Sequence, residues 1–425
     1  MKLLIGFFCL FSLFYDLSKF DGEVLMVVIL NRHGARTPLH KFPETDIFFP
    51  EYEKGVLTYN GWRQQILLGK YIKSKYLVNK QKIRGEPYIS VDNPSKQFLI
   101  ISSPLLRTVE SAMAYSLGLF PDHSYNMIDS GQVQTDSFNE VPPIKIPSNN
   151  FLLQDLSSFN ILISDKRRDI LFHGKKCKIH IDKAEDKDDA ELINEAEKGI
   201  VFRYLQNKFP ESMRGISLDD LSNTQIKYFN SAIVCVNFNF EDDLFKMSKD
   251  VQDAFSKFIV NYYYLKKLKN SNVTRIMSSQ FFDEIVKMFD FKLEKDINKK
   301  LYFFDNTQVN YDDLKLIVFS GHDSNILASL KNLIREDFLV SLLKNTQDSV
   351  DFLIPKFSSS IEFHLVKRAN RLFVRVIYDG VNISDRIQFG KNNEIEYDNF
   401  KNLLISKIYP GYENCDYKPA NLDED

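Results

Sequence analysis

Short, continuous runs of apolar residues recur along this chain, and each is soon followed by a glycine or a proline. The first run covers residues 24–30 and is rich in β-branched side chains, a composition typical of a strand that is buried on both faces. Similar runs cover residues 98–103, before Pro104, and residues 316–320, before Gly321. The three runs predict buried strands that each lead into a turn.

Apolar residues at helical spacing follow or separate these runs. Thr58 is a candidate N-cap for the first such segment, and Pro104 indicates a turn into the second. Near the C-terminus two segments, residues 360–366 and 372–378, alternate between apolar and polar side chains, as expected of a hairpin with one solvated face. The predicted helices cover residues 58–71, 105–113, 278–291, 326–334 and 400–408.

Strand signals become rare between residues 122 and 276. Irregular, proline-containing sequence is followed there by two amphipathic patterns, over residues 192–205 and 244–265, which predict helices. The alternating charges of residues 182–189 are typical of a solvated face, and a metal site is the less favoured alternative. We expect a mostly helical cap inserted into one α/β domain. The predicted division is an α/β domain, residues 19–121 and 277–415, a cap, residues 122–276, and a polar tail, residues 416–425.

The first predicted strand leads into Arg32-His33-Gly34-Ala35-Arg36, which places an imidazole between two guanidinium groups. Ligands of open α/β sheets bind outside the carboxyl ends of the strands, and a glycine lets the backbone approach an anion closely. Arg32 and Arg36 can each present paired donors to phosphate oxygens. Because their charges disfavour an imidazolium, His33 can act as a neutral nucleophile on phosphorus. The motif predicts a phosphate site in which a phosphohistidine forms and is then hydrolysed.

Two other predicted strand ends carry residues that could complete this site. Arg107 begins the helix after the second strand, where it can add a donor to a bound anion, although a surface ion pair is an equally good interpretation. After the third strand, Asp323 is placed to protonate a leaving oxygen and His322 to donate to the phosphate. An N-cap role for Asp323 and a buried structural role for His322 are the alternatives if the segment is taken alone. The strand ends meet if the strands are neighbours.

Composition excludes some classes of function. The 425 residues include 55 Lys and Arg against 57 Asp and Glu, so the chain lacks the basic excess of a nucleic-acid-binding protein. Its 36 Phe and 20 Tyr are more simply explained by a core than by a stacking surface. No G-x-S-x-G motif accompanies the histidines, which makes a serine hydrolase a remote alternative.

The N-terminus is predicted to be a secretory signal. Lys2 is followed by an apolar stretch too short to span a membrane comfortably, and residues 1–18 are its expected extent. A retained anchor is the alternative, and no later segment is a candidate span. Oxidising surroundings would make Asn272 and Asn382 plausible glycan acceptors. Removal of the signal takes Cys9 with it and leaves an odd number of cysteines, Cys177, Cys235 and Cys415.

Three motifs in this order resemble those of the histidine acid phosphatases, with the closest likeness to the lysosomal and prostatic type. They are residues 32–38, Arg107 before Thr108-Val109-Glu110-Ser111-Ala112, and His322-Asp323. The resemblance extends over nearly the whole mature chain, including residues 57–61 and 374–378. It implies a mixed central sheet with helices on both faces plus a helical cap, the phosphoglycerate mutase-like fold.

The resemblance also implies a role for each motif residue. His33 would be the nucleophile and Asp323 the proton donor, without a metal or cofactor. The residues expected to bind phosphate are Arg32, Arg36, Arg107 and His322. A disulfide between Cys177 and Cys415 is implied as well, and it would leave Cys235 without an evident partner.

We therefore expect an acid phosphatase that hydrolyses small phosphate monoesters in a lysosomal or vacuolar lumen or after secretion, in a family that often forms dimers. One departure is Ser102-Ser103-Pro104-Leu105-Leu106 ahead of Arg107, where animal members usually carry aspartates. Aspartate after His322 makes the chain look less like the fungal or inositol-polyphosphate branch. The alternatives are a phytase-like inositol phosphate phosphatase, a phosphomutase, which the signal disfavours, and a catalytically silent phosphate-binding or adhesion protein.

Overall fold

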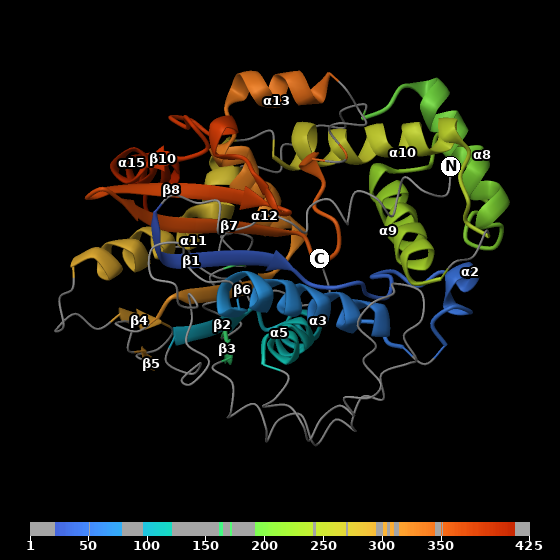
Figure 1. The fold of residues 1–425 in the computed structure, drawn as a ribbon. Coiled ribbons are helices and arrows are strands. Elements are labelled where there is room, and N and C mark those ends of the chain that lie inside the picture. Colours follow the sequence, from blue (N-terminus) through green and yellow to red (C-terminus); the bar gives the residue numbers. More distant parts are fainter. Residues whose placement is uncertain are drawn as a thin grey trace.

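The centre of the molecule is an eight-stranded mixed sheet in the order β10-β8-β7-β1-β6-β2-β3, with β9 paired to β8 (Figure 1). The computed structural model describes residues 22–50, 52–78, 97–120, 161–164, 171, 192–240, 244–268, 271–294, 301–303, 307–309, 314–344, 350 and 352–412. The strands of the sheet are β1 (Glu23–Arg32), β2 (Phe98–Ser102), β3 (Ile161–Ile163), β6 (Leu316–Gly321), β7 (Ser360–Arg368), β8 (Arg371–Tyr378), β9 (Val381–Asn382) and β10 (Ile395–Glu396). A separate pair is formed by β4 (Leu301–Phe303) and β5 (Thr307–Val309). The predicted α/β class with a mixed sheet is confirmed.

Four strands of the sheet run parallel, and β6 lies between β1 and β2. Arg32 at the end of β1 is level with Gly321 of β6, and Ser102 at the end of β2 is level with Ser320. The three apolar runs of the sequence are therefore neighbouring strands whose carboxyl ends share one edge. This meets the condition under which the separate motifs can form one site.

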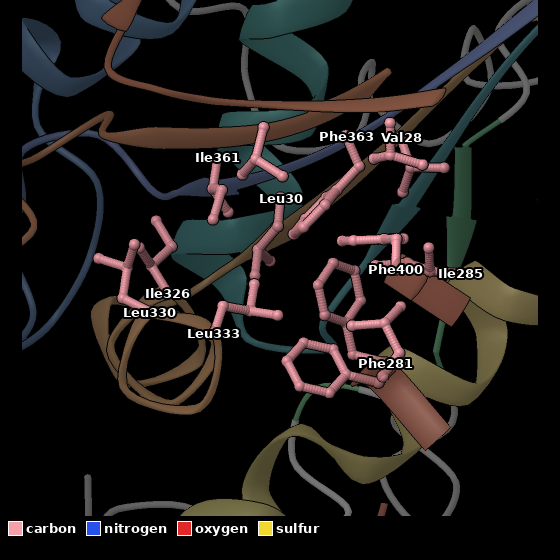
Figure 2. Close-up of a cluster of buried hydrophobic side chains, with 14 of the residues drawn as sticks. Val28, Leu30, Phe281, Ile285, Ile326, Leu330, Leu333, Ile361, Phe363 and Phe400 are labelled. Carbon is pink, nitrogen blue, oxygen red and sulfur yellow. The ribbon is translucent and has the colours of Figure 1, made fainter. Parts of the chain in front are cut away.

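Helices cover both faces of the sheet. Alternate residues of β1 point to opposite faces, so that Val27 and Ile29 pack against one layer and Val28 and Leu30 against the other. Figure 2 shows the second contact, where Val28 and Leu30 meet aromatic and aliphatic side chains of the covering helices. The first layer comprises α3 (Tyr59–Lys73), η3 (Ser74–Val78) and α5 (Leu106–Leu119). The second comprises α11 (Ser271–Glu294), α12 (Asp323–Leu333) and α15 (Tyr397–Lys407), with α13 (Glu336–Leu343) and η9 (Ser384–Arg386) nearby in the chain.

Thr58 has the predicted N-cap role, since its side chain accepts a hydrogen bond from the Gly61 N–H. Helix α3 then packs closely on the turn that follows β1. A Cβ at Gly34 would lie 2.3 Å from the Gly61 carbonyl oxygen, so neither glycine has room for a side chain. The Ala35 N–H donates to Gln64 Oε1 of α3 at 2.8 Å. These contacts fix the backbone that carries the first motif.

A second group of helices lies beyond the carboxyl ends of the strands, at the right of Figure 1. The unit has an apolar core of its own, in which Phe209, Phe229 and Phe258 are fully buried. Two of its helices match the segments predicted over residues 192–205 and 244–265, whereas α9 was not predicted. The elements are α8 (Glu195–Lys208), α9 (Asn223–Asn239), α10 (Lys249–Asn261) and the π-helix η8 (Tyr262–Lys267), with the short α2 (Pro43–Asp46) beside them.

The chain passes from one apolar core to the other within η8. Tyr262 belongs to the core of the helical unit, Tyr264 to that of the sheet, and Tyr263 packs against both. The predicted boundary between residues 276 and 277 falls inside α11, which begins at Ser271. Several predictions fall on residues outside those described, namely the signal at 1–18, most of the sequence between 122 and 191, Cys177, Cys415 and the tail at 416–425. Across the described part of the chain, no helix is both long and apolar enough to cross a membrane.

Strands β7 and β8 form the predicted hairpin, but the prediction of a solvated face is wrong. Glu362 and His364 of β7 are buried beneath η3. Lys75 Nζ lies 2.7 Å from Glu362 Oε2, and Tyr76 OH donates to the same oxygen at 2.8 Å. His364 Nε2 is also 2.8 Å from this oxygen. A π-helix almost three hundred positions away in sequence thus supplies partners to the polar face, as a buried carboxylate requires.

Burial lowers the pKa of His364 to about 4 from its ordinary value near 6.5, so the folded protein keeps this imidazole neutral where the unfolded chain protonates it. Below pH 6.5 the unfolded state binds the extra proton, so the contribution of His364 to the free energy of unfolding should fall by about 3 kcal/mol as the pH reaches 4. We predict that His364→Gln flattens this dependence, measured by urea denaturation across that range. The exposed His40, changed to Gln, is the matched control. Equal slopes in both variants would contradict the role of burial.

Candidate active site

The shared edge of β1, β6 and β2 brings together the residues of all three motifs. His33 follows β1 directly, Arg107 lies in the first turn of α5, His322 is the N-cap of α12, and Asp323 is the first residue of that helix. Arg36 lies three residues beyond His33 in the turn that α3 supports. Three segments separated by up to about three hundred positions thus meet at the ends of three parallel strands.

His33 is buried at the centre of this edge, with 3% of its surface exposed. Its N–H donates to the Gly321 carbonyl at 2.9 Å, which ties the turn after β1 to the end of β6. Nδ1 lies 2.8 Å from the Gly34 carbonyl oxygen. Because a carbonyl only accepts, Nδ1 is assigned the proton, and Nε2 keeps a lone pair. The His33 and His322 rings meet edge to face, with centroids 5.5 Å apart.

Burial is the first cause that holds the pKa of His33 well below its ordinary value. The positive charge of Arg107 acts in the same direction, followed by the charges of Arg32, His322 and Arg36. All these groups therefore lie close enough to the imidazole to destabilise its protonated form. A neutral imidazole in acid is the consequence, and a neutral imidazole is the form that can attack phosphorus.

Arg32 connects the first motif to the third. Its Nη2 lies 3.1 Å from Asp323 Oδ2, and its Nη1 donates to the Pro355 carbonyl at 2.7 Å. The guanidinium stacks over the Phe357 ring, 4.4 Å from the ring centroid, and this ring also lies 6.0 Å from that of His33. The carboxyl that was predicted to donate a proton therefore lies beside the predicted phosphate-binding arginine.

Arg36 is held by the helical unit. Its Nη1 donates to the Thr37 carbonyl at 2.8 Å and approaches Cys235 Sγ at 3.6 Å, and its Nη2 donates to Ser231 Oγ at 3.4 Å. Cys235 and Ser231 belong to α9. Burial raises the pKa of the Cys235 thiol, so this cysteine is a neutral, buried contact of the arginine.

The unusual Ser102-Ser103-Pro104-Leu105-Leu106 segment lies directly behind Arg107 and His322. Ser103 Oγ is 3.4 Å from His322 Nε2, and the Ser103 carbonyl accepts from Thr108 Oγ1 at 2.8 Å. On the next turn of α5, Ser111 Oγ accepts the Gly34 N–H at 3.1 Å. Hydroxyl groups from this segment and from α5 thus support both the second histidine and the turn after His33.

Four neighbours of the site were not predicted from the sequence, namely Ser103, Ser231, Cys235 and Phe357. A signal for α9 was present, because Ser222 and Gln225 form a capping box in the structure. Apolar residues follow that box at helical spacing, at Ile226, Phe229, Ile233 and Val236. Phe357 had no comparable signal, since it lies in an irregular loop.

In the part of the chain that the structure describes, no group of three or more His, Cys, Asp or Glu side chains could hold a metal ion. The groups gathered at this edge are an imidazole, a carboxyl group and guanidinium groups. Guanidinium groups suit the oxygens of a phosphate or a carboxylate.

Known proteins with similar sequences include acid phosphatases. Human testicular acid phosphatase is 32% identical over 107 residues, which cover 24% of this chain and 23% of that protein. The match thus spans about a quarter of that relative's length. A probable acid phosphatase of Dictyostelium discoideum is 23% identical over 390 residues, which cover 86% of this chain and 74% of that protein.

Among solved structures, the Hafnia alvei phytase in complex with myo-inositol hexakis sulphate superposes with a TM-score of 0.57 and 14% identity, covering 92% of this chain and 98% of that chain. At this identity the likeness shows a shared fold and nothing more. The family model of the histidine phosphatase superfamily (branch 2) matches residues 23–379, a range that holds β1, the helical unit and the β7–β8 hairpin. This chain therefore belongs to branch 2 of the histidine phosphatase superfamily.

Proposed function

We propose that this protein is an acid phosphatase that hydrolyses small phosphate monoesters through a phosphohistidine at His33. The observation that carries the proposal is the buried His33 imidazole, whose pKa is lowered by burial and by three arginines, next to the Arg32–Asp323 pair. Positive charge around a neutral nucleophile suits phosphoryl transfer, because negative charge spreads over the phosphate oxygens in the transition state and the arginines can stabilise it.

In the proposed reaction the phosphate lies between His33 and the three guanidinium groups. The lone pair of His33 Nε2 attacks phosphorus, the bond to the ester oxygen breaks, and Asp323 gives its proton to the departing alcohol. Water then attacks the phosphohistidine, and the Asp323 carboxylate takes a proton from that water. His33 is restored and inorganic phosphate leaves. Arg32, Arg36, Arg107 and His322 supply donors to the phosphate oxygens in both steps.

Inositol phosphates are a second candidate substrate class, because phytases are among the solved structures with this fold. A catalytically silent phosphate-binding protein is less consistent with the site, since a silent protein has no need of an imidazole kept neutral beside a carboxyl group. A panel of aryl, alkyl and inositol phosphates assayed on purified protein separates the two enzyme candidates.

We also propose that the helical unit is a cap inserted into the α/β domain, that residues 1–18 direct the chain into the secretory route, and that Cys177 pairs with Cys415. Of the two sequons, Asn272 is exposed. Asn382 is half-buried, and its amide donates to the Asn393 carbonyl at 2.8 Å and accepts the Ser384 N–H at 2.9 Å. The greater exposure of Asn272 makes a glycan more compatible with that residue in the folded protein.

We predict that His33→Ala lowers turnover of an aryl phosphate at mildly acidic pH, without added metal, by roughly four orders of magnitude or more, because it removes the nucleophile. Acid-labile phosphate should be trapped on the unmodified protein during turnover and should be absent from this variant. His40→Ala, at an exposed histidine, is the control and should keep full activity. An unchanged rate in His33→Ala would refute the assignment.

For Asp323→Asn the expected loss depends on the leaving group. An alkyl phosphate needs a proton on its departing oxygen, so its turnover should fall by roughly 100-fold or more. A p-nitrophenyl ester, whose leaving group is stable as an anion, should lose much less. The measurement is kcat for both esters in both proteins. Equal losses would remove Asp323 from the role of general acid.

The charge of Arg107 contributes to the low pKa of His33, so Arg107→Met should raise that pKa toward its ordinary value. NMR titration of the His33 imidazole in the absence of phosphate measures the shift directly. Arg371→Met, at an exposed arginine of the hairpin, is the matched control and should leave the His33 titration unchanged. Identical titration curves in the two variants would contradict the electrostatic explanation.

A further inference from the structure

We propose that Asp379 is a positioning residue for the phosphate site, acting through the loop of residues 355–360 that holds Arg32 and covers His33. The proposal rests on the function proposed above and extends it to a residue that none of the three motifs contains. Asp379 lies at the end of β8, in the turn that leads into β9.

Two backbone features place Asp379 in this turn. Tyr378 pairs with Val381, so Asp379 and Gly380 are the two central residues of a tight hairpin, with φ of 45° and 79°. Asp-Gly is a favoured pair for such a turn, in which both central residues adopt positive φ. The turn geometry alone would thus account for aspartate, asparagine or glycine at this position. Any further role of Asp379 has to follow from the hydrogen bonds that its carboxylate makes.

The carboxylate accepts two hydrogen bonds from the loop. Asp379 Oδ1 accepts the Ser360 N–H at 2.8 Å, and Oδ2 accepts the Ser359 hydroxyl at 2.9 Å. The Asp379 N–H in turn donates to the Ser360 carbonyl at 2.9 Å. Ser359 Oγ also accepts the Lys356 N–H at 2.8 Å, so the hydrogen bonds that begin at Asp379 extend through Ser359 to Lys356. The Asp379 side chain therefore adds to the backbone bond from the Ser359 N–H to the Lys356 carbonyl, at 3.0 Å, and to the bond from Gln65 Nε2 to Ser358 Oγ, at 2.9 Å, in holding this loop.

The opposite side of the same loop contacts the active site. The Ser359 carbonyl accepts the Arg32 N–H at 2.8 Å, the Ser358 N–H donates to the His33 carbonyl at 3.2 Å, and the Pro355 carbonyl accepts Arg32 Nη1 at 2.7 Å. Both the backbone and the side chain of Arg32 are thus set by a segment that Asp379 fixes.

Phe357 lies in the middle of this loop and connects it to the reacting groups. The ring supports the Arg32 guanidinium on one face and lies beside the His33 imidazole. A loop released from Asp379 would loosen the Pro355 carbonyl and the Phe357 ring together. Arg32 would then lose the orientation that aims its remaining donors at a bound phosphate, although Asp379 itself touches neither phosphate nor His33.

The test compares Asp379→Gly with Asn370→Gly. Glycine keeps the positive φ at residue 379 and removes the carboxylate, while Asn370, with φ of 64° in the turn at the other end of β8, receives the same backbone change. We expect Asp379→Gly to raise the dissociation constant of inorganic phosphate and the KM for an aryl phosphate about tenfold, the size of one positioned hydrogen bond. The kcat ratio between aryl and alkyl esters should stay as in the unmodified protein. Asn370→Gly should change none of these values.

Ser359→Ala cuts the same connection without touching the turn, and it carries the test if Asp379→Gly does not fold. Ser359→Ala should also weaken phosphate binding. The double variant should lose less binding free energy than the sum of the two single losses, because both changes break the same series of contacts. Asp379→Asn, which keeps one acceptor oxygen and suits the turn, should restore part of the affinity.

Phosphate affinity is read by calorimetry, independently of turnover. Equal affinity in Asp379→Gly and Asn370→Gly, or strict additivity with Ser359→Ala, would overturn the positioning role. An unmodified protein that binds phosphate but turns over no ester would instead overturn the proposed function and leave the positioning role intact.

Discussion

The parallel pairing of β6 with both β1 and β2 is the constraint on which the site depends. It places Arg32, Gly321 and Ser102 at the ends of adjacent strands, so the three turns that follow these strands begin at one edge of the sheet. Helices α5 and α12 both begin there, and their N-termini add the positive end of the helix dipole to the charge of the arginines. A slip of one residue in either pairing would turn the side chains at these strand ends to the opposite face.

Positive charge concentrated at one partly buried edge raises the free energy of the folded state unless acceptor groups lie beside it. Arg32 forms an ion pair with Asp323 and donates a hydrogen bond to the Pro355 carbonyl. Arg36 donates to the Thr37 carbonyl and to Ser231 Oγ. Within the described residues, the Nε atoms of Arg32 and Arg36 are nevertheless buried without a hydrogen-bond partner. Unsatisfied buried donors destabilise the folded state.

The helical unit takes part in the site through the end of α9. Asn239 Oδ1 accepts the Thr58 hydroxyl at 2.6 Å, its carbonyl accepts from Asn60 Nδ2 at 3.1 Å, and its Nδ2 approaches the Arg36 carbonyl at 3.4 Å. The last turn of α9, the start of α3 and the motif turn thus form one hydrogen-bonded network. Because α9 also contacts the Arg36 side chain through Cys235 and Ser231, a displacement of the helical unit would disturb Arg36.

The sequence by itself determined most of the elements around the site and the motif residues, because apolar runs, helical spacing and capping signals such as Thr58 are local properties of the chain. Only the tertiary structure decided which distant segments meet. Arg36 reaches Cys235 across 199 positions and Arg32 reaches Pro355 across 323, contacts that no periodicity encodes. The polar face of β7 shows the same limit, because its alternation predicted exposure to solvent, whereas η3 covers it. A pattern of polar residues requires polar partners, but it does not specify whether water or protein supplies them.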